Sequence, residues 1–476
     1  MPKTDRSTYD AIIIGAGIGG LVCGCYLAKA GMKVLIAEQH NNPGGYCTSF
    51  KRLGFTFDAG PHCFGSYRKE GITRKILEEL EIDDALTIIR PDPSDIIITP
   101  EHQFPVWNNL ERTLEHFQAA FPDEGPNIKR FFSLLLDTNP QSFSRLRKAT
   151  FKSILDQYFA NTKLKATLSF PLLAVNGLPP SLMSAFVGAK LYSEFIIDGG
   201  YYPQGGMQTL ADALAQRYKM YGGELQLSTR VKKIKTVEAR VEGVILGDGE
   251  VILSRYVVSN VDARQTFIKL LGKDCADPEF YRVLSSMIPS LSNFILYLGI
   301  DKDFRPVQNP GTAYHYFFHY DVEKAYRAVK KGDFAGYGGY ALRIAHDYST
   351  IYAGMPAPFK SKSYWMQNKQ STMISFISKI EETSIQHLSR YIQYRDAASP
   401  HTMFRYTSNY KGAAYGWAAI PSQLIVPGFR KPAFMQGLYL VGHWTTHGVG
   451  VSGAAYVGYD TARIITGKNV AKIPIF

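Results

Sequence analysis

The stretch YDAIIIGAGIGGLVCGCYLAKAGMKVLIAE, residues 9–38, decides the fold of this 476-residue chain. Residues 9–14 and 33–38 are short runs dominated by apolar residues, and a longer Ala- and Leu-rich segment between them ends near Gly31. Short apolar runs bounded by glycine predict strands, and the longer segment predicts a helix. The order strand, glycine turn, helix, strand is one βαβ unit, which favours an α/β fold with a parallel sheet.

Three glycines of this stretch, Gly15, Gly17 and Gly20, form a GxGxxG motif at the start of the predicted helix. The first allows a tight turn, the second lets the backbone approach a pyrophosphate, and the third lets the helix pack close to the strand. The helix N-terminus then presents N–H groups and the positive end of its dipole to phosphates. Glu38 ends the second strand, where a carboxylate can accept hydrogen bonds from both ribose hydroxyls. The unit predicts a dinucleotide site, with NAD and FAD both open on this motif alone.

A second glycine pair, Gly44 and Gly45, lies in NNPGGYCTSFKRLGFTFDAGPHCFGS (41–66), ahead of the turn FDAGPH. Here the chain resembles the FAD-containing family of bacterial-type phytoene desaturases, carotenoid cis-trans isomerases and retinol saturases. The resemblance continues through YYPQGGMQTLADALAQRYKMYGGELQLSTRVKKI (201–234), SPHTMFRYTSNYKGAAYGW (399–417) and GLYLVGHWTTHGVGVSGAAYVGYDTARII (437–465). It therefore covers nearly the whole chain.

The resemblance implies a Rossmann-like FAD-binding domain of the glutathione-reductase type, with an inserted mixed α+β substrate domain. We expect the FAD-binding domain to be assembled from residues 1–75, 200–275 and 431–476. We expect residues 76–199 and 276–430 to form a substrate-binding, membrane-facing domain. The cofactor contacts implied are Gly15, Gly17, Gly19, Gly20, Glu38, Gln39, Gly44, Gly45, Tyr46, His62, Val231, Gly442, Gly450 and Val451.

The family acts on C–C double bonds of long hydrophobic polyenes or isoprenoids, as desaturases, saturases or isomerases, and the resemblance implies one of these activities. His62, His443 and His447 are the candidate proton handlers, since histidine exchanges protons near neutral pH. The histidine at position 443 differs from the residue at the matching position of the isomerases and of many desaturases. Desaturation, saturation and isomerisation therefore all stay open. There is no second GxGxxG for a nicotinamide, which favours a quinone or oxygen as electron acceptor.

His443 and His447 are four residues apart in VGHWTTHGVGVSG (441–453), a spacing that metal ligands on a helix often show. Glycines on both sides disfavour a helix there, and no third ligand cluster stands out, so we predict no metal site. The stretch is better interpreted as a second cofactor loop, in which glycine backbone grips the flavin.

A formal charge of +12 suits an anionic surface, either nucleic acid or a membrane. A basic amphipathic helix predicted over 143–159 places Phe151, Ile154, Leu155 and Tyr158 on one face. The uncharged run 166–189 is interrupted by Pro171, Gly177, Pro179 and Pro180, which we expect to break a membrane-spanning helix. We therefore predict a cytoplasmic protein at a membrane surface, without nucleic acid; the oligomeric state is left open.

Two other classes of function stay open. One is a non-enzymatic isoprenoid-lipid carrier similar to the GDP-dissociation inhibitors, which the intact phosphate glycines and Glu38 disfavour. The other is a flavin amine oxidase acting on soluble amines, which the uncharged 166–189 run disfavours. A purified protein that is yellow from bound flavin would exclude the lipid carrier. Identification of the substrate would distinguish the amine oxidase from an enzyme that acts on polyenes.

Overall fold

The computed structural model describes residues 8–137, 140–275, 277–424, 426, 429–445 and 450–467. Its first sheet has seven strands, in the order β10-β11-β12-β1-β2-β9, with β18 also paired to β12. The strands are β1 (Thr8–Ile14), β2 (Val34–Ala37), β9 (Glu224–Gln226), β10 (Val231–Val237), β11 (Arg240–Leu246), β12 (Val251–Ser259) and β18 (Leu438–Leu440). The pairs β1–β2, β1–β12, β2–β9 and β12–β18 are parallel. The predicted parallel sheet is confirmed, and three separated segments of the chain build it.

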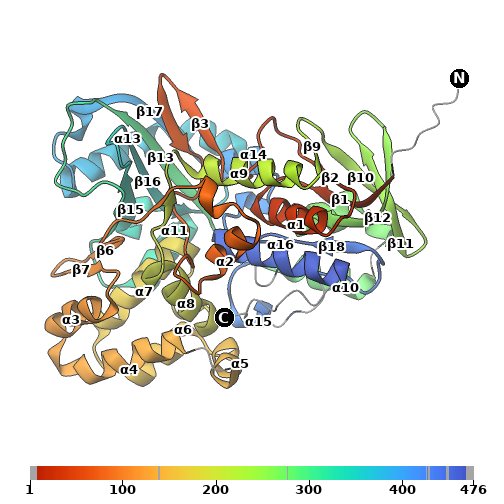
Figure 1. Ribbon diagram of the computed structural model, residues 1–476. Helices are drawn as coiled ribbons and strands as arrows, with labels where there is room; N and C mark the ends of the chain where they lie inside the picture. The colour runs from red at the N-terminus through yellow and green to blue at the C-terminus, as the bar shows by residue number, and fades with distance from the viewer. Residues whose placement is uncertain are drawn as a thin grey trace, which may run out of the picture.

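The apolar run of β1 is continuous because both faces of the strand are covered. Ala11 and Ile13 join the core beneath α1 (Ile18–Lys29), whereas Ile12 and Ile14 join the core on the opposite face. Helices α9 (Met207–Met220) and α16 (Gly450–Thr466) pack against α1, and α2 (Ile72–Glu79) packs against α16. This layer of helices lies beside the first sheet in Figure 1.

The second sheet also has seven strands, in the order β17-β13-β16-β15-β14-β6-β7. They are β6 (Asp95–Ile98), β7 (Gln103–Val106), β13 (Ser292–Ile300), β14 (Ala313–Phe317), β15 (Gly339–Ile344), β16 (Thr350–Ala357) and β17 (Ile392–Ala398). Two-stranded ribbons join β3 (Ser49–Arg52) to β4 (Phe55–Asp58) and β5 (Ile88–Ile89) to β8 (Tyr202–Pro203). The two large sheets occupy opposite sides of the molecule (Figure 1).

Helices from two stretches of the chain accompany the second sheet. The first stretch supplies α3 (Leu110–Ala120), α4 (Gly125–Leu136), α5 (Pro140–Lys148), α6 (Phe151–Tyr158), α7 (Thr162–Asn176) and α8 (Ala185–Leu191). The later one supplies α11 (Val322–Lys331), α12 (Phe334–Tyr337), α13 (Lys362–Thr383), α14 (Pro400–Thr407) and α15 (Pro421–Leu424), whereas α10 (Pro278–Ser286) packs in a core of the first sheet. The mixed α+β composition agrees with the expected inserted domain, and its residue limits stay a prediction.

One local prediction needs correction and a second is confirmed. The segment 143–159 forms two helices, because Thr150 caps a new helix by accepting a hydrogen bond from the Ser153 N–H. The predicted apolar face is nevertheless present: Phe151, Ile154 and Leu155 are buried. The uncharged run 166–189 is broken as predicted, because α7 ends at Asn176 with Gly177 in the left-handed conformation, although Pro171 itself lies inside α7. Within the described ranges, no helix combines the length and apolar character needed to cross a bilayer.

Candidate functional site

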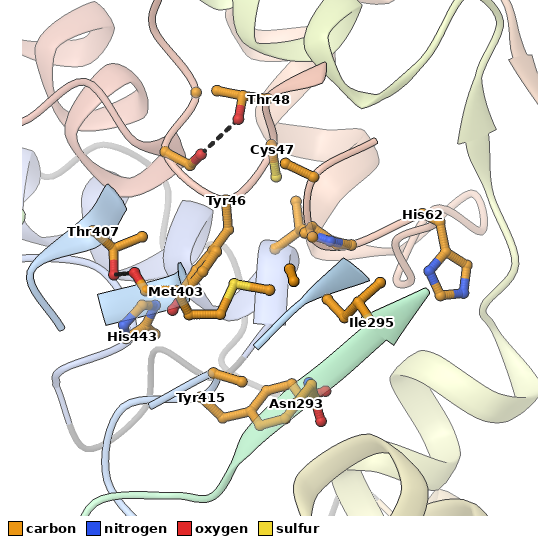
Figure 2. A pocket seen from close by; sticks show the side chains of 18 of the residues that line it. Tyr46, Cys47, Thr48, His62, Asn293, Ile295, Met403, Thr407, Tyr415 and His443 are labelled. Carbon is orange, nitrogen blue, oxygen red and sulfur yellow. Dashed lines mark hydrogen bonds between the residues drawn. The ribbon is translucent and has the colours of Figure 1, made fainter. Parts of the chain in front are cut away.

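A cavity of about 1700 Å³ is lined by loops that follow strands of the first sheet and by strand residues of the second sheet. Its walls include the glycine turn after β1, the loop after β2, the carboxyl end of β12 and the start of α16. They also include one face of the second sheet and parts of α7 and α8. Figure 2 shows part of its wall, with His62 and His443 at opposite ends of the labelled side chains and Asn293 and Ile295 of β13 near its middle.

Of the predicted dinucleotide-binding glycines in the first turn, Gly15, Gly17 and Gly19 line this cavity, whereas Gly20 is not among the lining residues. Gly15 has a φ of +96° and makes the turn, and Gly17 is the N-cap of α1 and has no side chain to occupy the helix N-terminus. A Cβ at Gly20 would lie 2.3 Å from the Gly15 carbonyl oxygen, and one at Gly19 would lie 2.8 Å from the Gly442 nitrogen. Gly20 therefore brings α1 against β1, and Gly19 brings it against the loop after β18.

A second set of backbone positions completes this cradle. Gly44, Gly45, Gly442 and Gly450 all have positive φ values, and all line the cavity. The Gly44 N–H donates to the Ala16 carbonyl at 2.7 Å, which fastens the loop after β2 to the glycine turn. Side chains at these positions would be strained or would fill the cradle. The bare backbone and the adjoining helix N-terminus fit the phosphates of FAD.

Glu38 is buried and its carboxylate is fixed by backbone. It accepts hydrogen bonds from the Ala16 N–H at 2.7 Å and the His40 N–H at 2.9 Å, and it borders the cavity. Gln39 also lines the cavity, while the side chain of Val231 packs in the core with Tyr9 and is not among the lining residues. The ribose contact of Glu38 and the cofactor contacts of Gln39 and Val231 stay predictions.

Tyr46, in the loop after β2, faces His443, in the loop after β18. Their rings stack with centroids 5.7 Å apart, and both line the cavity. The Tyr46 hydroxyl donates to the Ala413 carbonyl at 2.9 Å and accepts from the Asn409 amide at 3.1 Å. Burial lowers the pKa of His443 to about 4, so its imidazole is neutral at physiological pH.

His62 lies where the chain leaves β4 and reaches the second sheet. Its ring packs against Tyr352 with centroids 4.2 Å apart, and the Arg343 guanidinium donates to its carbonyl. Burial, followed by the charge of Arg343, lowers the pKa of His62 well below the usual value for histidine. Both His62 and His443 thus reach the cavity as neutral rings, whereas His447 lies outside the described residues.

Sequence reasoning missed three residues that organise the site. Asn260, directly after β12, lies against the backbone of Gly15, Gly17 and Gly20. Asp58 accepts hydrogen bonds from Ser49, Tyr202 and the Met207 N–H, which joins β4 to the start of α9. Its place in the FDAGPH turn was a usable signal. His315 is hydrogen-bonded to Asp95, which lies 220 residues earlier in the chain. No local sequence pattern indicates that these two residues meet.

The parallel sheet, the glycine cradle and the adjoining cavity together define an FAD-dependent oxidoreductase. The chain belongs to the flavin containing amine oxidoreductase family, which matches its residues 18–306. FAD is therefore its cofactor, and the flavin-free lipid carrier alternative is set aside.

Two relatives support the resemblance found in the sequence. The chain is 27% identical over 502 residues to a prolycopene isomerase of Daucus carota, covering 96% of this chain and 79% of that protein. It is 27% identical over 353 residues to an all-trans-retinol 13,14-reductase of Rattus norvegicus, covering 66% of this chain and 58% of that protein. The suspected family of desaturases, isomerases and retinol saturases is thus confirmed.

Solved structures confirm the fold. An oxidoreductase from Methanosarcina mazei superposes with a TM-score of 0.67 at 15% identity, over 94% of this chain and 99% of that one. A putrescine oxidase superposes with a TM-score of 0.66 at 15% identity, over 97% of this chain and 99% of that one. The predicted Rossmann-like domain with an inserted substrate domain is therefore confirmed as a fold class.

We expect the low pKa of His443 to make stability depend on pH. In the unfolded chain this histidine titrates near 6.5, and in the folded protein near 4, so the unfolded state binds more protons between these values. Its contribution is present above pH 6.5 and is lost as the pH falls toward 4, by up to about 3 kcal/mol. Chemical denaturation of the flavin-loaded protein and of His443→Gln across this window measures it. An identical pH dependence in the two proteins would refute the assignment.

Proposed function

We propose that this oxidoreductase acts on C–C double bonds of a long hydrophobic polyene or isoprenoid, as a desaturase, saturase or isomerase. The observation that carries the proposal is the single cavity of about 1700 Å³, which contains the glycine cradle and continues over the second sheet. Sites for one small ligand usually have about 300–1,000 Å³. The excess volume supports a second long ligand in contact with the first.

The floor of this continuation is largely apolar. Cross-strand neighbours Ala398, Ile295, Gly354 and Ala341 form one row across β17, β13, β16 and β15, and all four line the cavity. Directly paired residues project to the same face of a sheet, so the small side chains of this row leave an open groove. Such a groove binds hydrocarbon by burying it, since each buried CH₂ contributes about 0.8 kcal/mol.

Bound FAD would supply hydride transfer, and the protein would position the reacting bond and exclude water. Tyr297 fixes the turn that leads to His62, because its hydroxyl donates to the Ala59 carbonyl at 2.6 Å. His62 and His443 are the groups that we propose to accept or return a proton. Both are neutral at physiological pH and present a nitrogen lone pair. For a desaturation, a quinone or oxygen is proposed as the final electron acceptor.

We also propose that the substrate enters from a membrane surface near α5 and α8. Arg147, Phe186 and Lys190 line the cavity there, and Arg145 and Lys148 of α5 are exposed. Leu182, in the loop before α8, exposes 41% of its surface. Cationic side chains beside exposed apolar ones are typical of proteins that bind anionic lipid surfaces.

The test is to incubate the flavin-loaded protein, aerobically and separately with its flavin reduced, with candidate polyenes in anionic liposomes and to identify products by absorbance and mass. Loss of two hydrogens would establish a desaturase, gain of two a saturase, and an unchanged mass with a shifted spectrum an isomerase. Sedimentation with the liposomes tests the membrane surface separately. Turnover of a soluble amine, with every polyene unchanged, would instead establish the amine oxidase, whose support is limited to the fold and the family.

A further inference from the structure

Exposed side chains line a second end of the cavity, away from α5 and α8. They are Lys51 and Arg52 of β3, Lys362 and Met366 at the start of α13, and Arg405 near the end of α14. In Figure 1, β3 and α14 lie at the top of the molecule, whereas α5 and α6 lie at the bottom. A protein with its α5 end on a membrane therefore exposes this second end to water.

Four of these exposed residues are cations, Lys51, Arg52, Lys362 and Arg405, and we call them the basic face. Among the described residues, no carboxylate forms an ion pair with any of the four, whereas the nearby Lys369 is paired with Asp396 at 2.7 Å. Unneutralised charges of one sign at the mouth of a cavity attract a partner of the opposite sign and speed its association. The basic face thus fits an acidic partner.

Apolar side chains are exposed among these cations. Leu53, at the turn of the β3–β4 ribbon, is 80% exposed, Met366 is 76% exposed and Tyr406 is 49% exposed. Large apolar groups held in water next to charges are typical of contact surfaces, and Met, Tyr and Arg are enriched at protein–protein interfaces. A small anion would use the charges alone, so the combination fits an acidic protein.

The basic face lies directly beside the glycine cradle. The carbonyl oxygen of Tyr406, next to Arg405, is 2.6 Å from His40 Nε2, and the His40 N–H donates to Glu38 at 2.9 Å. Gly45 of the cradle is exposed and borders the same cavity. A protein docked on the basic face would therefore come close to bound FAD, as electron transfer between two proteins requires.

We infer that the basic face docks an acidic electron-carrier protein, which reduces the bound FAD. The inference rests on the proposed function, because saturation of a C–C double bond consumes two electrons and the sequence holds no second GxGxxG for a nicotinamide. Two molecules of a one-electron carrier are oxidised, and FAD takes up their two electrons with two protons from water. The two hydrogens then pass to the double bond, which leaves FAD oxidised.

The experiment mixes the flavin-loaded protein anaerobically with a reduced acidic ferredoxin and, in a second series, with a reduced acidic flavodoxin. Flavin absorbance gives the rate of reduction, and the binding of the two proteins is measured separately. Lys51→Glu/Arg52→Glu should lower both the rate constant and the affinity at least about tenfold at low ionic strength, and added salt should shrink the difference. Photoreduction with deazaflavin, which needs no docked protein, should stay within about twofold of the wild type.

Lys232→Glu/Lys233→Glu is the matched control, because it makes the same change of charge at exposed lysines of β10 that do not border the cavity. This variant should bind the carriers and be reduced by them like the wild type. If neither carrier reduces the wild type, or if the two double variants behave alike, the inference is overturned.

Two further measurements keep this inference apart from the proposed function. If Lys51→Glu/Arg52→Glu no longer sediments with anionic liposomes, the basic face binds a membrane and the inference is overturned. Conversion of polyenes is assayed with the photoreduced protein, without any carrier. Failure of that conversion, with reduction by a carrier intact, overturns the proposed function and leaves the docking of the carrier standing.

Discussion

Gly20→Ala should lose most of its FAD, with an affinity for the cofactor at least about tenfold below that of the wild type. The added Cβ would lie 2.3 Å from the Gly15 carbonyl oxygen and 3.2 Å from the Asn260 Cβ. Backbone cannot yield as a flexible side chain can, so α1 must move away from β1. Overpacking of this kind costs about 1–3 kcal/mol, and here it displaces the helix N-terminus that faces the phosphates.

Flavin content per protein, measured by absorbance after purification and after titration with FAD, checks this expectation. Gly125→Ala is the control, since Gly125 is helical and a Cβ there would meet only Gln118 at the ordinary distance of 3.5 Å. It should bind FAD like the wild type. Wild-type affinity in Gly20→Ala would show that the glycine turn does not hold the cofactor.

Gly354→Phe should abolish activity on polyenes while keeping the full complement of FAD. Gly354 lies on the cavity face of β16, between Ile295 and Ala341, and an added ring would fill the groove over the second sheet. Excluding even two CH₂ groups of a substrate costs about 1.6 kcal/mol, which is more than tenfold in affinity. The flavin cradle belongs to the other sheet and should be unaffected.

Gly354→Ala provides the matched control for size. Its Cβ would lie 3.6 Å from the Tyr352 ring, which is ordinary van der Waals contact, and the glycine φ is not positive. Turnover should therefore stay within about twofold of the wild type, since only a methyl group enters the groove. Full activity in both variants would mean that the substrate does not lie over β16.

Local sequence patterns predicted the glycine cradle that we propose to bind FAD. GxGxxG, the second glycine pair, Gly442 and Gly450 act through backbone conformation, and glycine at the required positions is visible in a sequence. Glu38 was recognised for the same reason, because it follows the motif at a fixed spacing. In the structure it also anchors the Ala16 and His40 N–H groups, a second role that the motif does not reveal.

The substrate half could not be predicted in this way. The row from Ala398 to Ala341 is formed by strands far apart in the chain, and its residues are too ordinary to stand out singly. Asp95 and His315 meet only because β6 pairs in parallel with β14. The wrong local prediction, a single helix over 143–159, has a local cause: the Thr150 side chain caps a new helix and so overrides the apolar pattern of the surrounding residues.

The most direct test of a cavity shared by flavin and polyene is the flavin absorbance spectrum during anaerobic titration. Polyenes and a soluble diamine such as putrescine are added separately to the flavin-loaded protein. Because the two ligands would be in contact, a polyene should shift or bleach the flavin bands saturably, and Gly354→Phe should prevent this. Putrescine should leave the spectrum unchanged. Bleaching by the diamine together with no response to any polyene would contradict the proposed function.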